Sequence, residues 1–219
     1  MINKMKLDYN RSLLLIIDMQ NDFCPGGALA VKNGDEVIGP LNRLSARFVS
    51  CGGRVAATQD WHPAGHLSFA SSHKNKKPGD TVDLAYTKNQ ALWPDHCIQG
   101  SYGAELHKGL DQKPIGLLIR KGFRMDIDSY SAFFENDRKT STGLDGFLKE
   151  LSINTIVLGG LALDYCVFYS AMDARSLGYN TIMVTDAVRG VDYPEGSVGE
   201  ALQSLGKAGV IITESGDIQ

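Results

Sequence analysis

The sequence lacks the excess of basic charge that nucleic acids and anionic membranes attract. It has 22 Lys and Arg against 25 Asp and Glu, which gives a formal net charge of −3. Binding to either kind of polyanion depends on clusters of basic residues. The nearest approach to such a cluster is the short segment KNKK at 74–77, whose composition is typical of a surface loop in water. We therefore expect neither nucleic acid nor membrane to be the main partner.

Long apolar runs are missing as well. A membrane-spanning helix needs about 20 consecutive apolar residues, and the apolar run near the start, Leu13–Ile17, is far shorter. Charged and amide residues follow that run, where a signal peptide would have small residues before its cleavage site. We expect a soluble, cytoplasmic protein.

Paired cysteines are also absent from the sequence. None of its four cysteines has a partner at the two-residue spacing of a zinc knuckle or a redox dithiol. In a reducing compartment they should be free thiols, and most free cysteines are small buried hydrophobic residues. A chemical role for any of the four needs further evidence. They are Cys24, Cys51, Cys97 and Cys166.

The 219 residues, 43% of them hydrophobic, fit one domain with a substantial core. We find no repeat and no linker, so the predicted domain spans 1–219, with 1–11 as a flexible lead. Short β-type runs alternate with helical segments. The predicted strands are 13–17, 54–58, 115–119, 155–158, 181–185 and 210–213, and the predicted helices lie at 37–49 and 164–177 and around 144–151 and 198–205.

This alternation predicts an α/β fold with a doubly wound, mainly parallel six-stranded sheet and helices on both faces. The continuous apolar run Leu13–Ile17 is typical of a central parallel strand that is covered on both faces. Asp35 is the expected N-cap of the first helix, and Gly52-Gly53 should end it.

Ligands of such sheets bind outside the carboxyl ends of the strands, and polar residues stand at those ends here. Asp18 ends the first strand, Asp60 the second and Lys121 the third. The fourth strand leads through a double glycine to Cys166. The segment 62–114 shows little regularity, and loops of this length inside compact domains are usually functional.

Cys166 should lie in the first turn of a helix. The unpaired N–H groups and the dipole of a helix N-terminus lower the pKa of a thiol and can also hold a negative oxygen. Asp18 could accept the thiol proton, and Lys121 could orient both groups. These residues by themselves leave open a second interpretation, a buried cysteine beside an ordinary Asp–Lys ion pair.

Asp60, His62 and His96 together supply one carboxylate and two imidazoles, a donor set suited to a divalent ion with open positions for water and substrate. His66 is the candidate fourth ligand. We interpret His73 and His107 as ordinary surface or core histidines. Surface or core positions are also the alternative for the candidate ligands.

Five motifs resemble those of the nicotinamidases, also called pyrazinamidases, of the isochorismatase-like cysteine hydrolases. They are LLLIIDMQNDFCPGGALAV (13–31), TQDWHPAGHLSFAS (58–71), WPDHCIQGSYGAELH (93–107), RKG with DSYSAFF (120–122 and 128–134), and GLALDYCV (160–167). Any one motif is weak evidence, but five in the same order are highly specific. The resemblance extends from about residue 11 to the C-terminus and implies an isochorismatase-like fold.

The implied activity is metal-dependent hydrolysis of nicotinamide to nicotinate and ammonia, and of pyrazinamide to pyrazinoate, through a thioester. The resemblance places the family's catalytic triad on Asp18, Lys121 and Cys166. It also implies a cis peptide at Leu161-Ala162, so that the N–H groups of Ala162 and Cys166 form the oxyanion hole. Many members read GxATDxCV, whereas Leu163 replaces that threonine here.

The resemblance also implies a metal ion and a ring pocket. The family's metal ligands fall on Asp60, His62 and His96, and His66 matches a further ligand of some members. The implied cofactor is one divalent ion, Zn²⁺ ahead of Fe²⁺ or Mn²⁺, which binds the pyridine nitrogen and orients the carboxamide. The substrate-binding residues expected around the ring are Phe23, Leu29, Trp93, Tyr130 and Leu161.

Two alternatives remain, one within the enzyme class and one outside it. The chain could be another isochorismatase-like hydrolase, although isochorismatases lack the cysteine and the carbamoyl hydrolases of this scaffold do not require the metal motif. It could instead be a non-catalytic metal-binding module, against which the intact triad argues. The resemblance further implies nicotinamide as a small-molecule partner and a place in NAD salvage, and it leaves open whether the chain forms a homo-oligomer.

Overall fold

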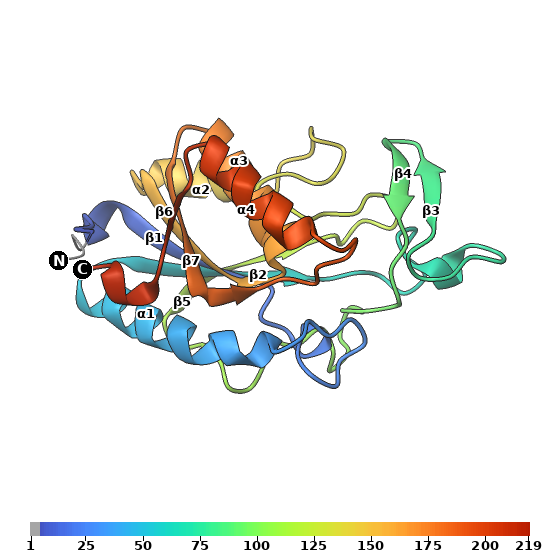
Figure 1. Cartoon of the computed structure of the whole chain (residues 1–219), viewed down its shortest axis with the longest axis horizontal. Helices are drawn as coiled ribbons and strands as arrows, with labels where there is room; N and C mark the ends of the chain where they lie inside the picture. Colours follow the sequence, from blue (N-terminus) through green and yellow to red (C-terminus); the bar gives the residue numbers. More distant parts are fainter. Residues whose placement is uncertain (1–4) are drawn as a thin grey trace.

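Six strands form the central sheet of the computed structural model, which describes residues 5–219. All neighbouring strands of this sheet are parallel, so the predicted doubly wound parallel sheet is confirmed (Figure 1). In spatial order the strands are β5 (Ile115–Lys121), β2 (Arg54–Asp60), β1 (Ser12–Ile17), β6 (Thr155–Leu161), β7 (Asn180–Arg189) and β8 (Ile211–Thr213).

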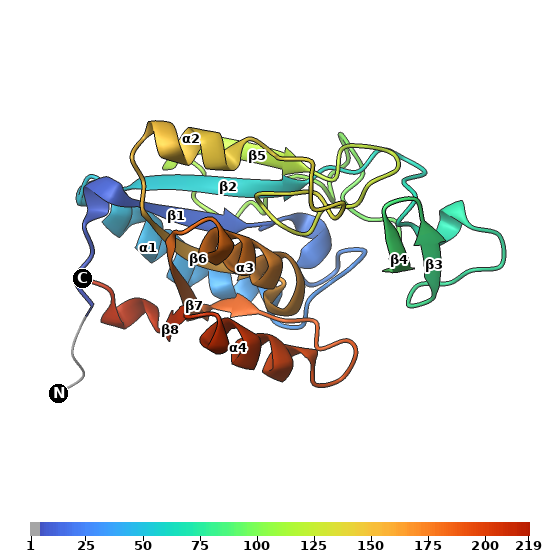
Figure 2. The ribbon, with the colours of Figure 1, turned by 90° about the horizontal axis from the view of Figure 1, so that it is seen from above.

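Helices cover both faces of the sheet, with α1 on one side and the other three on the opposite side (Figures 1 and 2). Their bounds are α1 (Ile38–Ser50), α2 (Leu144–Glu150), α3 (Phe168–Ser176) and α4 (Ser197–Lys207). Alternate residues of β1 serve the two sides: Leu14 and Ile16 pack in the cluster that contains α1, and Leu15 packs in the cluster of the other helices. Every residue of β1 is therefore buried, which explains its continuous apolar run.

The order of the strands reverses between β1 and β6, because the chain first builds the sheet outward through β2 and β5 and then returns to build the other half. Ligands of open parallel sheets bind at such a switch point. Gly160 allows a close approach of β6 to β1 here. Its φ is +122°, and a Cβ on this residue would lie 2.1 Å from the carbonyl oxygen of Ile17.

Two local predictions need correction. Asp35 is not the N-cap of α1, because the helix continues directly from a 3₁₀ turn at Gly34–Val37 and no side chain caps it. The predicted helix over 164–177 begins as a wider π-helical turn, Leu163–Val167, before α3. Such turns frequently occur at functional sites, and this one carries Cys166.

The irregular segment 62–114 contains a hairpin that the sequence does not predict. Its strands, β3 (Thr81–Leu84) and β4 (Thr87–Ala91), pair antiparallel and stand apart from the main sheet (Figures 1 and 2). Gln90 is the buried residue of β4. Because β4 buries a polar side chain instead of an apolar row, its sequence lacks the alternation that identifies strands. In β3 the alternation covers only four residues, too few to mark a strand clearly.

Part of the N-terminal segment contacts the C-terminal end of the chain, and the flexibility expected of 1–11 stays a prediction. Residues 1–4 lie outside the described residues. Met5 forms a parallel bridge with Ile218, and the N–H of Leu7 donates to the carbonyl of Gln219 at 3.0 Å. Met5 and Leu7 thus pair with the last residues of the chain.

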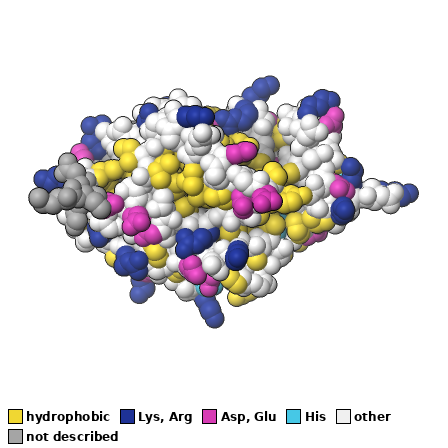
Figure 3. All heavy atoms as spheres, in the orientation of Figure 1, with side chains coloured by type: hydrophobic (Ala, Val, Ile, Leu, Met, Phe, Trp, Pro, Cys, Tyr) yellow, Lys and Arg dark blue, Asp and Glu magenta, His cyan; other side chains and the backbone are white. Residues whose placement is uncertain are grey.

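The helices of residues 5–219 are all too short or too polar to cross a membrane. On the face of the molecule shown in Figure 3, Lys and Arg side chains are interspersed with Asp and Glu. That face therefore presents no broad surface of a single charge.

Candidate active site and metal centre

The ammonium of Lys121 joins the two predicted sites. It is fully buried at the end of β5. Its Nζ lies 2.8 Å from Oδ2 of Asp18, 2.6 Å from Oδ1 of Asp60 and 3.4 Å from Sγ of Cys166. The sequence predicts its contacts with Asp18 and Cys166 but not the one with Asp60. That contact arises because β5 pairs with β2 so that Lys121 stands opposite Asp60.

The backbone and one threonine hold Asp18 in place. Its φ of +46° is uncommon for a residue with a side chain and is the kind of strain found at functional sites. The Thr58 hydroxyl donates to Oδ1 of Asp18 at 2.6 Å and accepts the N–H of Asp18 at 3.1 Å. Oδ2 is thereby left for Lys121.

Burial and mutual contact separate the two carboxyl groups in acidity. Burial raises the pKa of Asp18, despite the opposing charge of Lys121. Burial would also raise the pKa of Asp60, but Lys121 and His62 outweigh it and hold that pKa well below its usual range. Burial alone would lower the pKa of Lys121, yet the two carboxylates raise it well above its ordinary value. Asp18 is therefore the carboxyl group better suited to exchange a proton.

The thiol of Cys166 does not have the lowered pKa that the sequence predicts from a helix N-terminus. Burial raises its pKa well above the ordinary value, and the opposing effect of Lys121 does not overcome this. The thiol therefore needs a base at the moment of reaction. Asp18 is in place for this, because its carboxylate and the sulfur lie within 4.8 Å of each other.

Three side chains direct ligand atoms to one point. Oδ2 of Asp60 lies 3.5 Å from Nε2 of His62 and 3.8 Å from Nε2 of His96. Nδ1 of His62 is 2.9 Å from the carbonyl oxygen of Gly122, and Nδ1 of His96 is 2.8 Å from that of Pro94. Since a carbonyl can only accept, both Nδ1 atoms carry the proton and both Nε2 atoms offer a lone pair. Nε2 of His62 is buried without a hydrogen-bond partner, so this donor set fits a divalent ion.

His66 lies beside this cluster with both ring nitrogens engaged. The N–H of Ser68 donates to Nδ1 at 3.1 Å, and Nε2 is 3.3 Å from the carbonyl oxygen of Ile127. Its ring packs against that of His62, with 4.5 Å between centroids. In this geometry the His66 ring packs against His62 and limits the movement of that ring. The role of His66 as a metal ligand stays a prediction.

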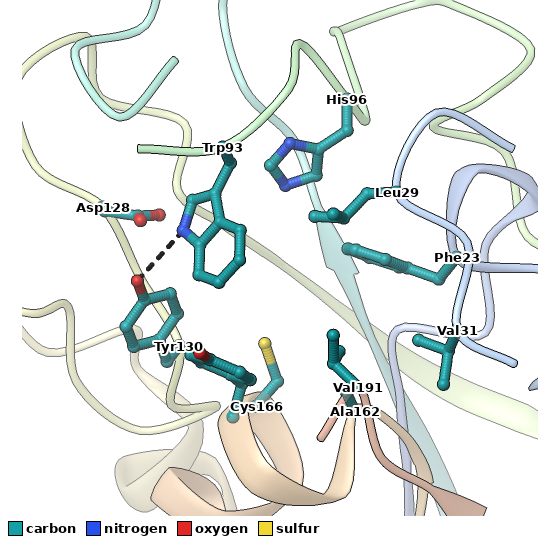
Figure 4. A pocket seen from close by; sticks show the side chains of 11 residues that line it. Phe23, Leu29, Val31, Trp93, His96, Asp128, Tyr130, Ala162, Cys166 and Val191 are labelled. Atoms are coloured by element: carbon teal, nitrogen blue, oxygen red, sulfur yellow. Dashed lines mark hydrogen bonds between the residues drawn. The ribbon is translucent and has the colours of Figure 1, made fainter. Parts of the chain in front are cut away.

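The thiol and an imidazole face each other across one cavity (Figure 4). Figure 4 shows Cys166 at one end and His96 at the other, with Trp93 and Tyr130 on one side and Phe23 on the opposite side. Four of the five predicted substrate-binding residues line the cavity: Phe23, Leu29, Trp93 and Tyr130.

Leu161 is the predicted substrate contact that lies elsewhere. Its side chain is fully buried in the cluster that contains α1. Residues that the sequence analysis missed also line the cavity, namely Val31, Asp128, Tyr165 and Val191. Tyr165 could have been found as the neighbour of Cys166, and Asp128 stands in the DSYSAFF motif. Nothing in the sequence marks Val191, which reaches the cavity from the segment after β7.

The peptide between Leu161 and Ala162 is cis, as the resemblance implies. Ala162 lines the cavity together with Cys166. Leu163, which replaces the common threonine, is 6% exposed and packs in the apolar cluster beneath α3 and α4. A leucine suits that apolar position.

A family model described as the isochorismatase domain matches residues 12–217. The nicotinamidase of Acinetobacter baylyi is 47% identical, over 92% of this chain and 91% of its own length. The nicotinamidase of Escherichia coli is 45% identical, over 91% of this chain and 92% of its own.

Solved structures are similar in shape. An Acinetobacter baumannii nicotinamidase and pyrazinamidase superimposes with a TM-score of 0.90 at 45% identity, over 95% of this chain and 98% of that one. An L. infantum protein in complex with nicotinate has a TM-score of 0.84 at 36% identity, over 99% and 98% of the two chains. A Pyrococcus horikoshii pyrazinamidase in complex with zinc has a TM-score of 0.76 at 29% identity, over 93% and 99%.

Proposed function

This chain belongs to the isochorismatase family. We propose that within this family it is a nicotinamidase, a cysteine amidohydrolase that converts nicotinamide and water to nicotinate and ammonia, as its relatives of 45–47% identity are named. The observation that carries the proposal is the cavity itself, which has a thiol at one end and an imidazole of the metal-ligand cluster at the other. The relatives named nicotinamidase support the choice of substrate.

The cavity suits a flat ring with a carboxamide at one end and a basic nitrogen at the other. Trp93 and Phe23 supply apolar walls on opposite sides (Figure 4), and burial between such walls is how pockets hold small aromatic ligands. The carboxamide carbon would lie at Cys166 and the ring nitrogen toward His96. A divalent ion held by Asp60, His62 and His96 would supply a Lewis-acid position for that nitrogen, and the zinc of the P. horikoshii relative favours Zn²⁺.

The residues of this chain can perform the reaction in two halves. Asp18 takes the proton of the Cys166 thiol, and the thiolate attacks the carboxamide carbon. The backbone N–H groups of Ala162 and Cys166 stabilise the oxyanion. Asp18 then gives its proton to the departing ammonia, which leaves a thioester. Water hydrolyses the thioester with Asp18 again as base, while Lys121 holds Asp18 in position.

The same geometry makes pyrazinamide a second substrate, since it too has a ring nitrogen and a carboxamide. The contact of Lys121 with both Asp18 and Cys166 argues against a non-catalytic module. Burying an ammonium and a carboxylate beside a thiol costs free energy, and a module without catalytic activity gains nothing from that arrangement. From the family resemblance we also infer a cytoplasmic place in NAD salvage.

Release of ammonia from nicotinamide by the purified protein, loaded with Zn²⁺, tests this function. We expect one ammonia for each nicotinamide consumed, and we expect Cys166→Ala to reduce the rate at least about 10³-fold because the nucleophile is lost. Cys51→Ala is the matched control, since Cys51 is exposed and far from the cavity lining. Benzamide, which lacks the ring nitrogen, should be a poor substrate. A metal-loaded wild-type protein that releases no ammonia would refute the proposal.

A further inference from the structure

Asp128 is an acidic side chain in the cavity wall for which the proposed reaction has no use. It follows β5, is 2% exposed and lines the same largely apolar cavity as Cys166. Figure 4 shows its carboxylate beside the indole of Trp93. A buried carboxylate is costly unless its charge is compensated, so its presence here needs a reason.

The hydrogen-bond donors around Asp128 do not supply that compensation, and the one basic side chain within 4.0 Å of it in the described part of the chain is His62. Oδ1 accepts the N–H of Ser129 at 2.8 Å, and Oδ2 accepts a hydrogen bond from Nε2 of Gln90 at 3.1 Å. Both donors are neutral. Within residues 5–219, no Lys or Arg forms an ion pair with Asp128.

What faces Asp128 instead is the metal-ligand cluster. Oδ1 lies 4.0 Å from Nε2 of His62, the buried nitrogen that has no hydrogen-bond partner. Because Nδ1 of His62 is bound to the carbonyl of Gly122, a neutral ring presents its Nε2 lone pair toward the carboxylate. Two electron-rich atoms at this separation are stable only if a positive charge or a hydrogen-bond donor lies between or beside them.

The balance of buried charges points the same way. Three carboxylates, those of Asp18, Asp60 and Asp128, are buried in this part of the molecule together with the ammonium of Lys121, which contacts the first two. None of these four residues is more than 4% exposed. When all are ionised, three negative charges face one positive charge, and two negative charges remain. A divalent cation neutralises that remainder.

We propose that Asp128 belongs to the metal site as its outer carboxylate, which accepts a hydrogen bond from a water bound to the ion and supplies part of the negative charge that the ion neutralises. The inference rests on the divalent ion of the proposed function. Asp128 lies outside the set of ligand atoms that are within 4.8 Å of one another. Two donors on one ion at about 2.1 Å each lie no more than about 4.2 Å apart, so contact through water fits better than direct ligation.

The hairpin holds this carboxylate in place. Gln90 of β4 donates to Asp128 and also to the Tyr130 hydroxyl at 3.2 Å. The Tyr86 hydroxyl accepts the N–H of Asp128 at 3.1 Å and donates to Oε1 of Gln90 at 2.9 Å. The role of the β3–β4 hairpin is thus to position a carboxylate at the metal site.

Zinc affinity, measured on metal-stripped protein by competition with a chromogenic chelator, tests this role. We expect Asp128→Asn to weaken zinc binding 10- to 100-fold, the usual loss when an outer hydrogen-bonding partner of a metal site is removed. Glu135→Gln is the matched control. Glu135 is also 2% exposed and on the same segment, but its carboxylate lies 3.4 Å from Arg124. Its substitution should leave zinc affinity unchanged.

Thermal unfolding with and without zinc separates this role from a merely structural one. Without metal, Asp128→Asn should be at least as stable as wild type, because an uncompensated buried charge is removed. With zinc, the variant should gain less stability than wild type, because its affinity is lower. A structural residue would lower both melting temperatures together.

Equal zinc affinity of variant and wild type, or a metal-free variant that is less stable or unfolded, would overturn the role of Asp128 alone. The second result would mean that an imidazolium of His62 compensates the carboxylate. Failure of wild type to bind zinc would overturn the metal site of the proposed function, and this inference with it.

Discussion

At the scale of single residues, Lys121 has the largest effect on the arrangement of the site, because it contacts Asp18, Asp60 and Cys166. A fully buried ammonium is tolerated only when paired, and this one has two carboxylates and a sulfur within reach. It favours the ionised form of Asp60, which the proposed role as a metal ligand requires, and it contacts Asp18 beside the thiol. One side chain therefore connects the proposed nucleophile to the proposed metal ligands.

Lys121→Met should lower kcat on nicotinamide by about 10²–10⁴-fold, since the proton-transferring carboxylate loses its positioning partner. It should also destabilise the fold by about 3–5 kcal/mol, because Asp18 and Asp60 are left buried without a cation. Steady-state kinetics and urea unfolding measure the two effects.

Lys149→Met is the control for this substitution. Lys149 pairs with Asp145 at 2.7 Å on the surface of α2, with its side chain 65% exposed, so the change should cost no more than about 0.5 kcal/mol. If the Lys121 variant kept the wild-type kcat, the role of Lys121 would be purely structural.

The residue types of the site could be read from the sequence, because polar residues at strand ends stand out against apolar runs. Their contacts could not. The engagement of both His66 nitrogens by Ser68 and Ile127 depends on how two loops meet. The burial of Leu161 away from the cavity depends on which face of β6 its side chain occupies.

At the scale of elements, the contact between β6 and β1 governs the placement of Cys166. Both strands end at the switch point, and Gly160 brings β6 close enough to Ile17 that no side chain would fit between them. The π-helical turn that follows, Leu163–Val167, then directs Cys166 into the cavity. A helix of ordinary pitch was the sequence-based expectation, because local periodicity does not distinguish one wide turn.

Gly160→Ala should destabilise the protein by at least about 1–3 kcal/mol. The added methyl would lie 2.1 Å from the Ile17 carbonyl oxygen, and the φ of +122° disfavours any residue with a side chain. The midpoint of urea unfolding measures the change.

Gly199→Ala is the control: the same substitution should raise the stability of the protein instead of lowering it. Gly199 lies in α4, where a Cβ would meet open space, so alanine should stabilise the helix by about 0.5–1 kcal/mol. If both variants unfolded at the wild-type midpoint, the close packing of β6 on β1 would be disproved.

At the scale of the whole molecule, the sheet brings the ends of four strands to one edge. Asp18, Asp60, Lys121 and Cys166 come from β1, β2, β5 and the turn after β6, and they meet because neighbouring parallel strands end side by side. The same architecture leaves the four cysteines in different surroundings. Cys51 is exposed, while Cys24, Cys97 and Cys166 are buried.

Titration of the native protein with a thiol reagent should therefore show three classes of cysteine. Cys51 should react first and without loss of activity. Cys166 should react more slowly, with loss of activity, because it is 6% exposed at a cavity wall. Cys24 and Cys97 should react only on unfolding, because they are 2% and 0% exposed and do not line the cavity.

Cys51→Ser should abolish the fast phase and leave the other phases unchanged. Nicotinate in the cavity should slow the phase that inactivates the enzyme. Loss of activity that follows the fast phase would contradict the placement of Cys166 as the nucleophile.

The sequence by itself determined the parallel α/β sheet, the residues at its strand ends and the family, because apolar periodicity and ordered motifs are local properties of a chain. Only the tertiary structure decided that Lys121 contacts both the Cys166 thiol and Asp60 of the proposed metal ligands, that Val191 and Asp128 reach the cavity, and that a polar hairpin holds Asp128. Those features depend on strand register and on contacts between segments distant in sequence, which are settled when the whole chain packs.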